Sequence, residues 1–337
     1  MHEFYLILGI TIVIIIAFDF FYTTVSINGA GLLARYVSSG IAAIFLWINR
    51  KTQNRWLFQF SGMIHILALV TLWLAFLWMG FFLLLMGDPN SVIHPASGAV
   101  SDTTDKIYFS GYTLSTLGNG EYVPGDGIWQ IVVAGFSFAG FIFITTAMSY
   151  LISLTSAVIH KKNLSLFISN LGETPEKIVN NTFNGDDFKQ LEKIVPELQQ
   201  MINKHNQNHF AHPGVHYFYS RSRSESLAIN ISNLDEALTI IHHHVDKSGR
   251  WNQQLRPLRD AISKFLDTIQ HHFAATHKLD LKDSLPLNYL QSSEIPLVES
   301  AEISQAVQER RALLAGLLRS TGWSWSDIYK NSEPPNK

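Results

Sequence analysis

The sequence predicts a mainly α-helical membrane protein with a polar helical domain behind its membrane helices. Residues 57–86 and 127–159 contain no Asp, Glu, Lys or Arg. Each run is long enough to cross a bilayer, because a helix rises about 1.5 Å per residue. From residue 161 onward the chain is rich in charged and amide side chains. We therefore divide it into an N-terminal segment, 1–56, a membrane domain, 57–160, and a helical domain, 161–337.

Composition narrows the classes of function. The 337 residues are 47% hydrophobic, carry a formal net charge of -2 and include no cysteine. The net charge gives no reason to expect a nucleic-acid partner. Without cysteine, the chain has neither disulfides nor thiolate metal ligands, and we expect it to need no cofactor. We find no nucleophile paired with a base in the sequence, so we expect no enzymatic activity.

The N-terminal segment begins with an apolar run from Phe4 to Phe18 that continues through Tyr22. No basic region precedes this run and no small-residue cleavage site follows it, so we expect a retained membrane helix rather than a signal peptide. Asp19 lies near the end of the run. It is either a functional carboxylate within the membrane or a side chain that is solvated or hydrogen-bonded at the interface.

Residues 30–49 have two interpretations. Their apolar side chains recur at helical spacing on one face, which is typical of an amphipathic helix lying on the membrane surface. The chain would then cross the membrane three times, with its N-terminus outside. If residues 30–49 cross instead, the chain crosses four times and its N-terminus is inside. Both alternatives give a multi-pass protein of the cell membrane whose domain 161–337 is cytoplasmic, as the distribution of basic residues favours.

The segment between the two uncharged runs predicts an ion pathway. Residues 87–105 are mostly polar, and the half-apolar stretch after them is too short to cross the membrane. It leads into the run Thr116-Leu117-Gly118-Asn119-Gly120. A cation that leaves water needs replacement oxygens, and backbone carbonyls can supply them where glycines accept unusual backbone angles. Non-helical backbone at membrane depth is tolerated where it lines a water-filled cavity, so we expect a re-entrant loop.

Residues 57–160 resemble the two-helix pore module of the potassium channel superfamily, in the form of bacterial ion channels with a single pore loop per chain. The order of an uncharged run, a short helix, a glycine-containing loop and a second uncharged run matches the outer helix, pore helix, selectivity filter and inner helix. The glycine-containing run stands where the family has Thr-Val-Gly-Tyr-Gly. The resemblance therefore implies that the permeant ion binds to Thr116, Leu117, Gly118, Asn119 and Gly120.

The resemblance also implies roles for side chains around the filter. Tyr108 and Phe109 stand where pore-helix aromatic residues surround the filter, and Tyr112 stands where some members have a supporting glutamate. Glu121 takes the place of the acidic residue that follows the filter. Gly140 falls at the inner-helix position of a gating hinge. A glycine within a helix can equally serve close packing, so both roles stay open for Gly140.

The function implied by the resemblance is potassium conduction by a homotetramer in membrane lipid. A filter needs four loops around one axis, and this chain carries one. Asn119 stands in place of the family's tyrosine, so a non-selective channel for sodium and potassium is an alternative. A non-conducting membrane sensor or assembly protein that keeps the pore fold is another. The sequence identifies no gating ligand.

Domain 161–337 is predicted to be helical, because apolar residues recur in it at spacings of three and four. Breaks are expected at Asn184-Gly185, Pro213-Gly214 and Ser248-Gly249. Asn233 followed by Glu236 predicts a helix start with a capping box.

Two polar features of this domain have alternative interpretations. The histidines form clusters that are either solvated or interface side chains, or act as a metal or pH sensor. They are His205, His209, His212 and His216, then His242, His243 and His244, then His271 and His272. The loop 220–226, Ser-Arg-Ser-Arg-Ser-Glu-Ser, is either a solvated linker or a segment that is phosphorylated or faces lipid headgroups.

Overall fold

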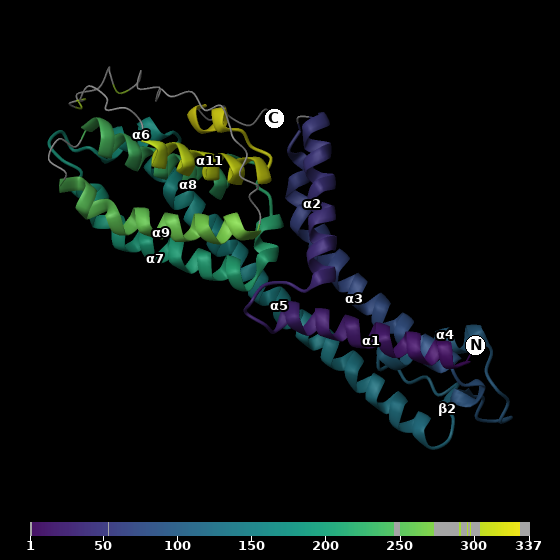
Figure 1. The fold of residues 1–337 in the computed structure, drawn as a ribbon. Helices are drawn as coiled ribbons and strands as arrows, with labels where there is room; N and C mark the ends of the chain where they lie inside the picture. Colours follow the sequence, from purple (N-terminus) through teal and green to yellow (C-terminus); the bar gives the residue numbers. More distant parts are fainter. Residues whose placement is uncertain are drawn as a thin grey trace. The chain divides into compact units, whose positions relative to one another are not determined.

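The computed structural model describes residues 2–52, 54–245, 250–272, 290, 295, 297 and 304–330. It confirms a mainly α-helical protein (Figure 1). The chain forms two compact units. Unit 1 consists of Met1–Ile41 and Met63–Thr155, and unit 2 consists of Ala42–Gly62 and Ser156–Lys337.

Unit 1 contains the elements expected for a pore module. They are α1 (His2–Thr24), the start of α2 (Leu32–Thr52), most of α3 (Ser61–Met86), α4 (Thr103–Leu114) and the first part of α5 (Ile128–Leu171). The short 3-10 helix η2 (Pro89–Ser91) and the strands β1 (Val92–Ile93) and β2 (Val123–Pro124) lie in the segments that join α3, α4 and α5. The two strands are antiparallel, with Val92 opposite Pro124, and so tie the two ends of the α4 region together.

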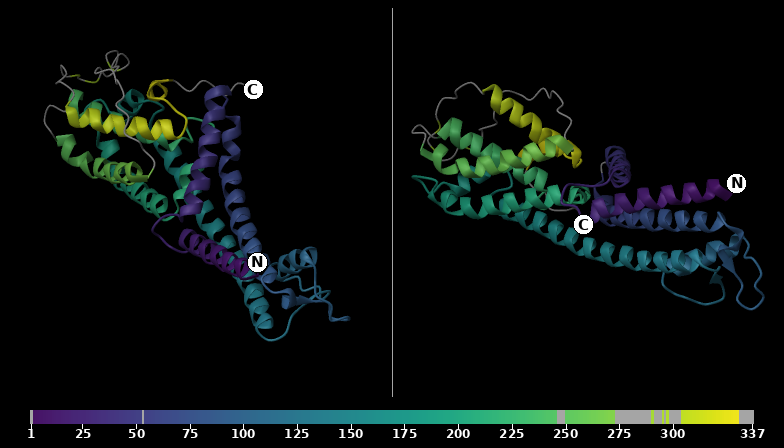
Figure 2. Two further views of the ribbon diagram at one scale, coloured as in Figure 1. Left: turned by 45° about the vertical axis from the view of Figure 1, so that its right-hand side comes forward. Right: turned by 60° about the horizontal axis from the view of Figure 1, so that its bottom comes forward.

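Helix α1 packs antiparallel to α3 at close range. A Cβ atom on Gly9 would lie 2.8 Å from the Gly80 carbonyl oxygen, and one on Gly87 would lie 2.3 Å from the Leu6 side chain. Small residues at such positions let two membrane helices approach each other closely. The N-terminus therefore lies at the same end of unit 1 as the loops that follow α3 (Figure 2).

The direction of α1 bears on the number of membrane crossings. In the described residues, four helices are long and apolar enough to cross: α1, α2, the segment Trp56–Met86 and α5. If α2 crossed between α1 and α3, then α1 and α3 would have to run in the same direction. Their antiparallel packing favours the three-crossing alternative.

Asp19 holds the start of α2 against α3. Its Oδ1 accepts a hydrogen bond from the Leu33 N–H at 2.8 Å, and its Oδ2 accepts one from the Trp73 indole N–H at 2.9 Å. A helix begins with backbone N–H groups that lack helical partners, and a carboxylate there satisfies them. Of the two roles considered for Asp19, the contacts favour the hydrogen-bonded, structural one.

Aromatic rings fill the core of unit 1. Phe20 of α1 stacks on Phe143 of α5, with ring centroids 4.1 Å apart. Phe81 of α3 stacks on Phe136 of α5 at the same distance. Helix α5 is thus packed against both other long helices of this unit.

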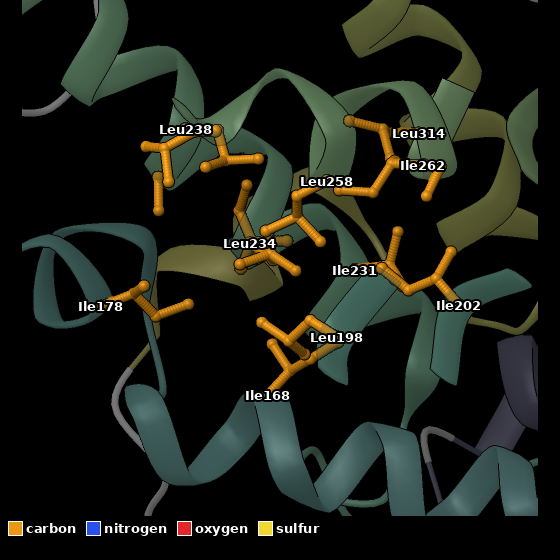
Figure 3. Packing of buried hydrophobic residues seen from close by; sticks show 14 of the residues in the cluster. Ile168, Ile178, Leu198, Ile202, Ile231, Leu234, Leu238, Leu258, Ile262 and Leu314 are labelled. Atoms are coloured by element: carbon orange, nitrogen blue, oxygen red, sulfur yellow. The ribbon is translucent and has the colours of Figure 1, made fainter. Parts of the chain in front are cut away.

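Unit 2 is a helical domain around one buried helix. Its remaining elements are η1 (Trp56–Phe60), α6 (Pro175–Thr182), α7 (Lys189–Ala211), η3 (Pro213–Tyr217), α8 (Leu227–Ile240), η4 (Ile241–Val245), α9 (Arg250–His272), α11 (Gln305–Ser320) and η5 (Trp325–Tyr329). Every residue of α8 is buried. Figure 3 shows Leu234 and Leu238 of α8 among side chains from α6, α7, α9 and α11.

The predicted capping box at Asn233 and Glu236 is wrong. Helix α8 begins at Leu227, after Ser226, and both residues lie buried within it. Because α8 is covered on all sides, its polar side chains find partners in other segments. The Asn233 amide donates to the Glu173 carbonyl oxygen at 2.8 Å, and Glu236 accepts from Arg311 Nε at 3.1 Å.

The predicted breaks have different outcomes. Asn184-Gly185 lies between α6 and α7, as expected. Pro213-Gly214 opens η3, which follows the end of α7. Ser248-Gly249 lies outside the described residues.

Candidate functional site

The short helix α4 is anchored to the end of α3. Its first turn has a capping box, in which the Asp105 N–H donates to the Asp102 side chain at 2.9 Å. The buried Lys106 ammonium donates to the carbonyl oxygens of Leu85, at 2.9 Å, and Asp88, at 2.7 Å. These carbonyls follow the last turn of α3 or belong to it, where acceptors lack helical partners. The position and tilt of α4 are thereby fixed.

The loop after α4 alternates in the sign of φ. Thr116, Gly118 and Gly120 have φ of 60°, 61° and 77°, whereas Leu117 and Asn119 keep negative φ. Alternation between left- and right-handed backbone turns successive carbonyls toward the same side of the chain, unlike a β-strand, in which they alternate. Glycine adopts positive φ without strain, but β-branched Thr116 does so at a cost. Strain of this kind is typical of functional sites.

The loop is open to its surroundings in the single chain. All residues from Ser115 to Glu121 are exposed, and Leu117 is 65% exposed. A Cβ atom on Gly118 or Gly120 would meet nothing within 4 Å. In the single chain the loop therefore presents an open face.

Asn119 is held by the pore-helix aromatic residues. Its amide nitrogen donates to the Tyr108 hydroxyl oxygen at 2.5 Å. The Tyr108 ring meets Tyr112 edge to face at 5.1 Å between centroids, and Phe109 meets Tyr112 in the same way at 5.3 Å. The structure therefore places the three predicted supporting aromatics together and couples one of them to the loop.

Tyr122, for which the sequence predicted no role, links the loop to α4. The Tyr112 hydroxyl donates to the Tyr122 carbonyl oxygen at 2.7 Å, and the Tyr122 hydroxyl donates to Asp105 Oδ1 at 2.7 Å. The Asp105 carboxylate stabilises the neutral phenol, so this hydrogen bond raises the pKa of Tyr122 to about 12. The strand exit of the loop is thus tied back to the start of α4. An aromatic residue directly after Glu121 was the available signal.

Gly140 lies against the end of α4. A Cβ atom there would stand 2.0 Å from the Leu114 carbonyl oxygen, whereas one on Gly135 would meet nothing within 4 Å. Helix α5 runs unbroken from Ile128 to Leu171. The contact gives Gly140 a packing role, and the hinge stays a prediction.

The histidine-rich segments of unit 2 are partly buried. His205, His209 and His216 are buried, and the His205 and His209 ring centroids lie 6.0 Å apart. In the part of the chain that the structure describes, no three His, Asp or Glu side chains are placed to hold a metal ion. The side chains of His271 and His272 lie outside the described set.

Comparison with known proteins shows the class of protein to which the chain belongs. Residues 67–157 match the model of a protein family described as "Ion channel", so the chain carries an ion-channel domain of the two-helix potassium channel type. No solved structure matches the chain. Over 334 residues the chain is 31% identical to the "Uncharacterized membrane protein YdjJ" of Bacillus subtilis (strain 168), and the match covers 96% of each chain. The chain belongs to the family of that membrane protein.

Proposed function

We propose that four copies of this chain form a channel that conducts potassium ions through the backbone carbonyls of Thr116–Gly120. The alternation of φ along this run is the observation that carries the proposal. It gives a short row of carbonyl oxygens that face one side, and such oxygens can replace the hydration shell of an alkali cation. Thr116, which is strained by its positive φ, is the first residue of the row and carries a side-chain hydroxyl.

The exposure of the loop supports a tetramer. A single row of carbonyls can surround a cation on one side only, and rings of four are what a filter requires. Helix α5 also exposes large apolar side chains along its membrane part, which suits contacts with other copies and with lipid. They are Ile131, Phe138, Phe141, Ile144, Met148 and Ile152.

The Asn119–Tyr108 hydrogen bond favours potassium over a non-selective pore. It turns the Asn119 side chain toward the pore helix, so the side chain restrains the backbone at this position. We infer that it stands in for the packing that the family's tyrosine provides. A non-selective cation channel and a non-conducting sensor are the alternatives that the experiment must separate.

Two observations support an assignment of the sides of the membrane: the position of the pore loop in unit 1 and the distribution of basic residues. The N-terminal end of α1 and the pore loop share one end of unit 1. Arg50 and Lys51 end α2, and Lys161 and Lys162 follow the apolar part of α5. Basic residues flanking membrane spans favour the cytoplasm, so we assign the pore loop to the outside and unit 2 to the cytoplasm.

A matched pair of glycine variants tests the proposal. Purified protein in potassium-loaded liposomes should release potassium, and Gly118→Ala should abolish the release because alanine is strained at positive φ. Gly98→Ala is the control, since Gly98 has φ of 66° and equally open space but lies outside the loop. Equal loss in both variants, or potassium release that survives Gly118→Ala, would contradict the filter assignment. Crosslinking should yield a species with four times the 38.0 kDa mass of the chain.

A further inference from the structure

Unit 2 contains a large cavity that the pore does not explain. Its volume is about 1530 Å³. Its walls come from residues 54–62, the C-terminal part of α5, the segment 218–230 and the segment 323–330. All of these residues belong to unit 2.

Basic side chains outnumber acidic ones around the cavity. The basic residues are Arg55, Lys161, Lys162, Arg221, Arg223 and Lys330. The acidic residues are Glu173, Glu225 and Asp327. A concave surface with an excess of one charge attracts ligands of the opposite charge.

Besides Arg223, four of these cations have partners, and two of the four build the walls. Lys162 pairs with Glu225 at 3.4 Å, and Lys330 pairs with Asp327 at 2.8 Å. Arg55 donates to the carbonyl oxygens of Ser220, at 2.9 Å, and Gly322, at 2.7 Å, and its guanidinium lies over the Trp323 ring at 3.6 Å. The Lys161 ammonium donates to two carbonyl oxygens of the segment 213–218, each at 3.0 Å. These side chains fix the cavity and are not its free donors.

The Arg223 guanidinium has hydrogen-bond donors that no described residue accepts. Its Nη2 donates to the Glu173 carbonyl oxygen at 3.1 Å. Its Nε and Nη1 atoms are buried, and neither has a hydrogen-bond partner in the described part of the chain. Leaving such donors unpaired is costly, and the guanidinium fork matches the oxygens of a phosphate group.

The loop that carries Arg223 is held in one conformation. The Asn230 amide donates to the Ser224 carbonyl oxygen at 2.8 Å, and the Ser165 hydroxyl donates to the same oxygen at 3.0 Å. Arg221 and Ser222 of this loop are exposed. Because the loop is already held in one conformation, the binding of an anion to its donors costs little conformational entropy.

We propose that this cavity binds a phosphate group through Arg221 and Arg223. The group belongs either to a phospholipid headgroup or to a soluble phosphate compound. This site is independent of ion conduction, and it assigns a ligand-binding role to the serine- and arginine-containing loop 220–226.

The test uses the full chain in a non-ionic detergent. It is titrated with inorganic phosphate and, separately, with short-chain phosphatidylglycerol, and diacylglycerol serves as the lipid that lacks phosphate. We expect saturable binding of at least one phosphate probe. The double variant Arg221→Gln/Arg223→Gln should weaken it about tenfold or more, because charge-assisted hydrogen bonds are lost. Arg319→Gln, an exposed arginine of α11 outside the cavity, is the matched control.

The two probes separate the sources of the phosphate group. Binding of phosphatidylglycerol alone identifies a lipid headgroup, and binding of inorganic phosphate identifies a soluble ligand. Hydrogen exchange of residues 220–226 in the unsubstituted protein gives a second readout, which should slow when the probe is added. Absence of saturable binding by both probes, or equal binding by the double variant and the unsubstituted protein, overturns the proposal.

Discussion

The amide of Asn119 and the hydroxyl of Tyr108 are joined by a hydrogen bond of 2.5 Å. This contact connects the backbone of the candidate filter to the pore helix through side chains. Both residues belong to unit 1, and Asn119 stands where the potassium channel family has a tyrosine.

Replacing Tyr108 with phenylalanine should loosen the filter. The ring packing remains, but Asn119 loses its acceptor. A hydrogen bond contributes about 0.5–1.5 kcal/mol, so we expect the potassium-to-sodium permeability ratio to fall about two- to tenfold. Reversal potentials measure this ratio. Tyr36→Phe, at an exposed tyrosine of α2, is the control, and an unchanged ratio in Tyr108→Phe would show that the contact does not set selectivity.

Gly140 and Gly135 should respond differently to alanine. A Cβ atom on Gly140 would stand 2.0 Å from the Leu114 carbonyl oxygen, so Gly140→Ala must displace the end of α4. Overpacking of this kind costs about 1–3 kcal/mol. Gly135→Ala meets no atom within 4 Å and gains helix propensity of up to about 1 kcal/mol.

Thermal unfolding in detergent checks this pair. We expect a lower melting temperature for Gly140→Ala and an unchanged or higher one for Gly135→Ala. If Gly140→Ala kept its stability but lost channel opening, the hinge role would be favoured over the packing role.

Breaking the buried ion pair between α8 and α11 should destabilise unit 2. Arg311→Met leaves the Glu236 carboxylate buried without its charge partner. Removing one partner of a buried pair costs about 3–5 kcal/mol. Arg256→Met, which removes an exposed pair with Asp260, should cost at most about 1 kcal/mol. Similar losses in the two variants would contradict the account of unit 2.

The same pair gives a pH dependence. Burial raises the pKa of Glu236, and Arg311 opposes that rise. A carboxyl group whose pKa is higher in the folded protein contributes stability at low pH and loses it as the pH rises through the folded value. Arg311→Met removes the opposing charge, so its melting temperature should fall more steeply above about pH 4.3 than that of the unsubstituted protein. Parallel pH profiles would contradict this.

The topology can be tested with single cysteines, because the chain has none of its own. A membrane-impermeant maleimide should label His2→Cys and Ser97→Cys on intact cells, and Ser222→Cys only after lysis. All three positions are exposed. Labelling of His2→Cys only after lysis would show that α2 crosses the membrane and that α1 and α3 are parallel.

Much of the pore module could be predicted from the sequence, whereas its supporting contacts could not. Uncharged runs long enough to cross a membrane reveal helices directly, and the spacing of Gly118 and Gly120 indicates unusual backbone. The role of Tyr122 depends on a fold-back onto Asp105 that leaves no periodic pattern. Asn233 has the local chemistry of a helix start but lies inside α8, because tertiary partners override local capping signals.

The direction of α1 relative to α3 could also not be predicted from the sequence. Hydropathy gives the length of a helix but not its direction, and residues 30–49 fitted both alternatives. The close approach of Gly9 to Gly80, and of Leu6 to Gly87, favours the alternative with three crossings.

The selectivity of the pore is given by the reversal potential of the purified protein in planar bilayers, with potassium on one side and sodium on the other. Potassium conduction through the carbonyls of Thr116–Gly120 predicts a current that reverses far from zero, on the side set by the potassium gradient, and that Gly118→Ala abolishes. A reversal near zero, or no current under any condition, would contradict it.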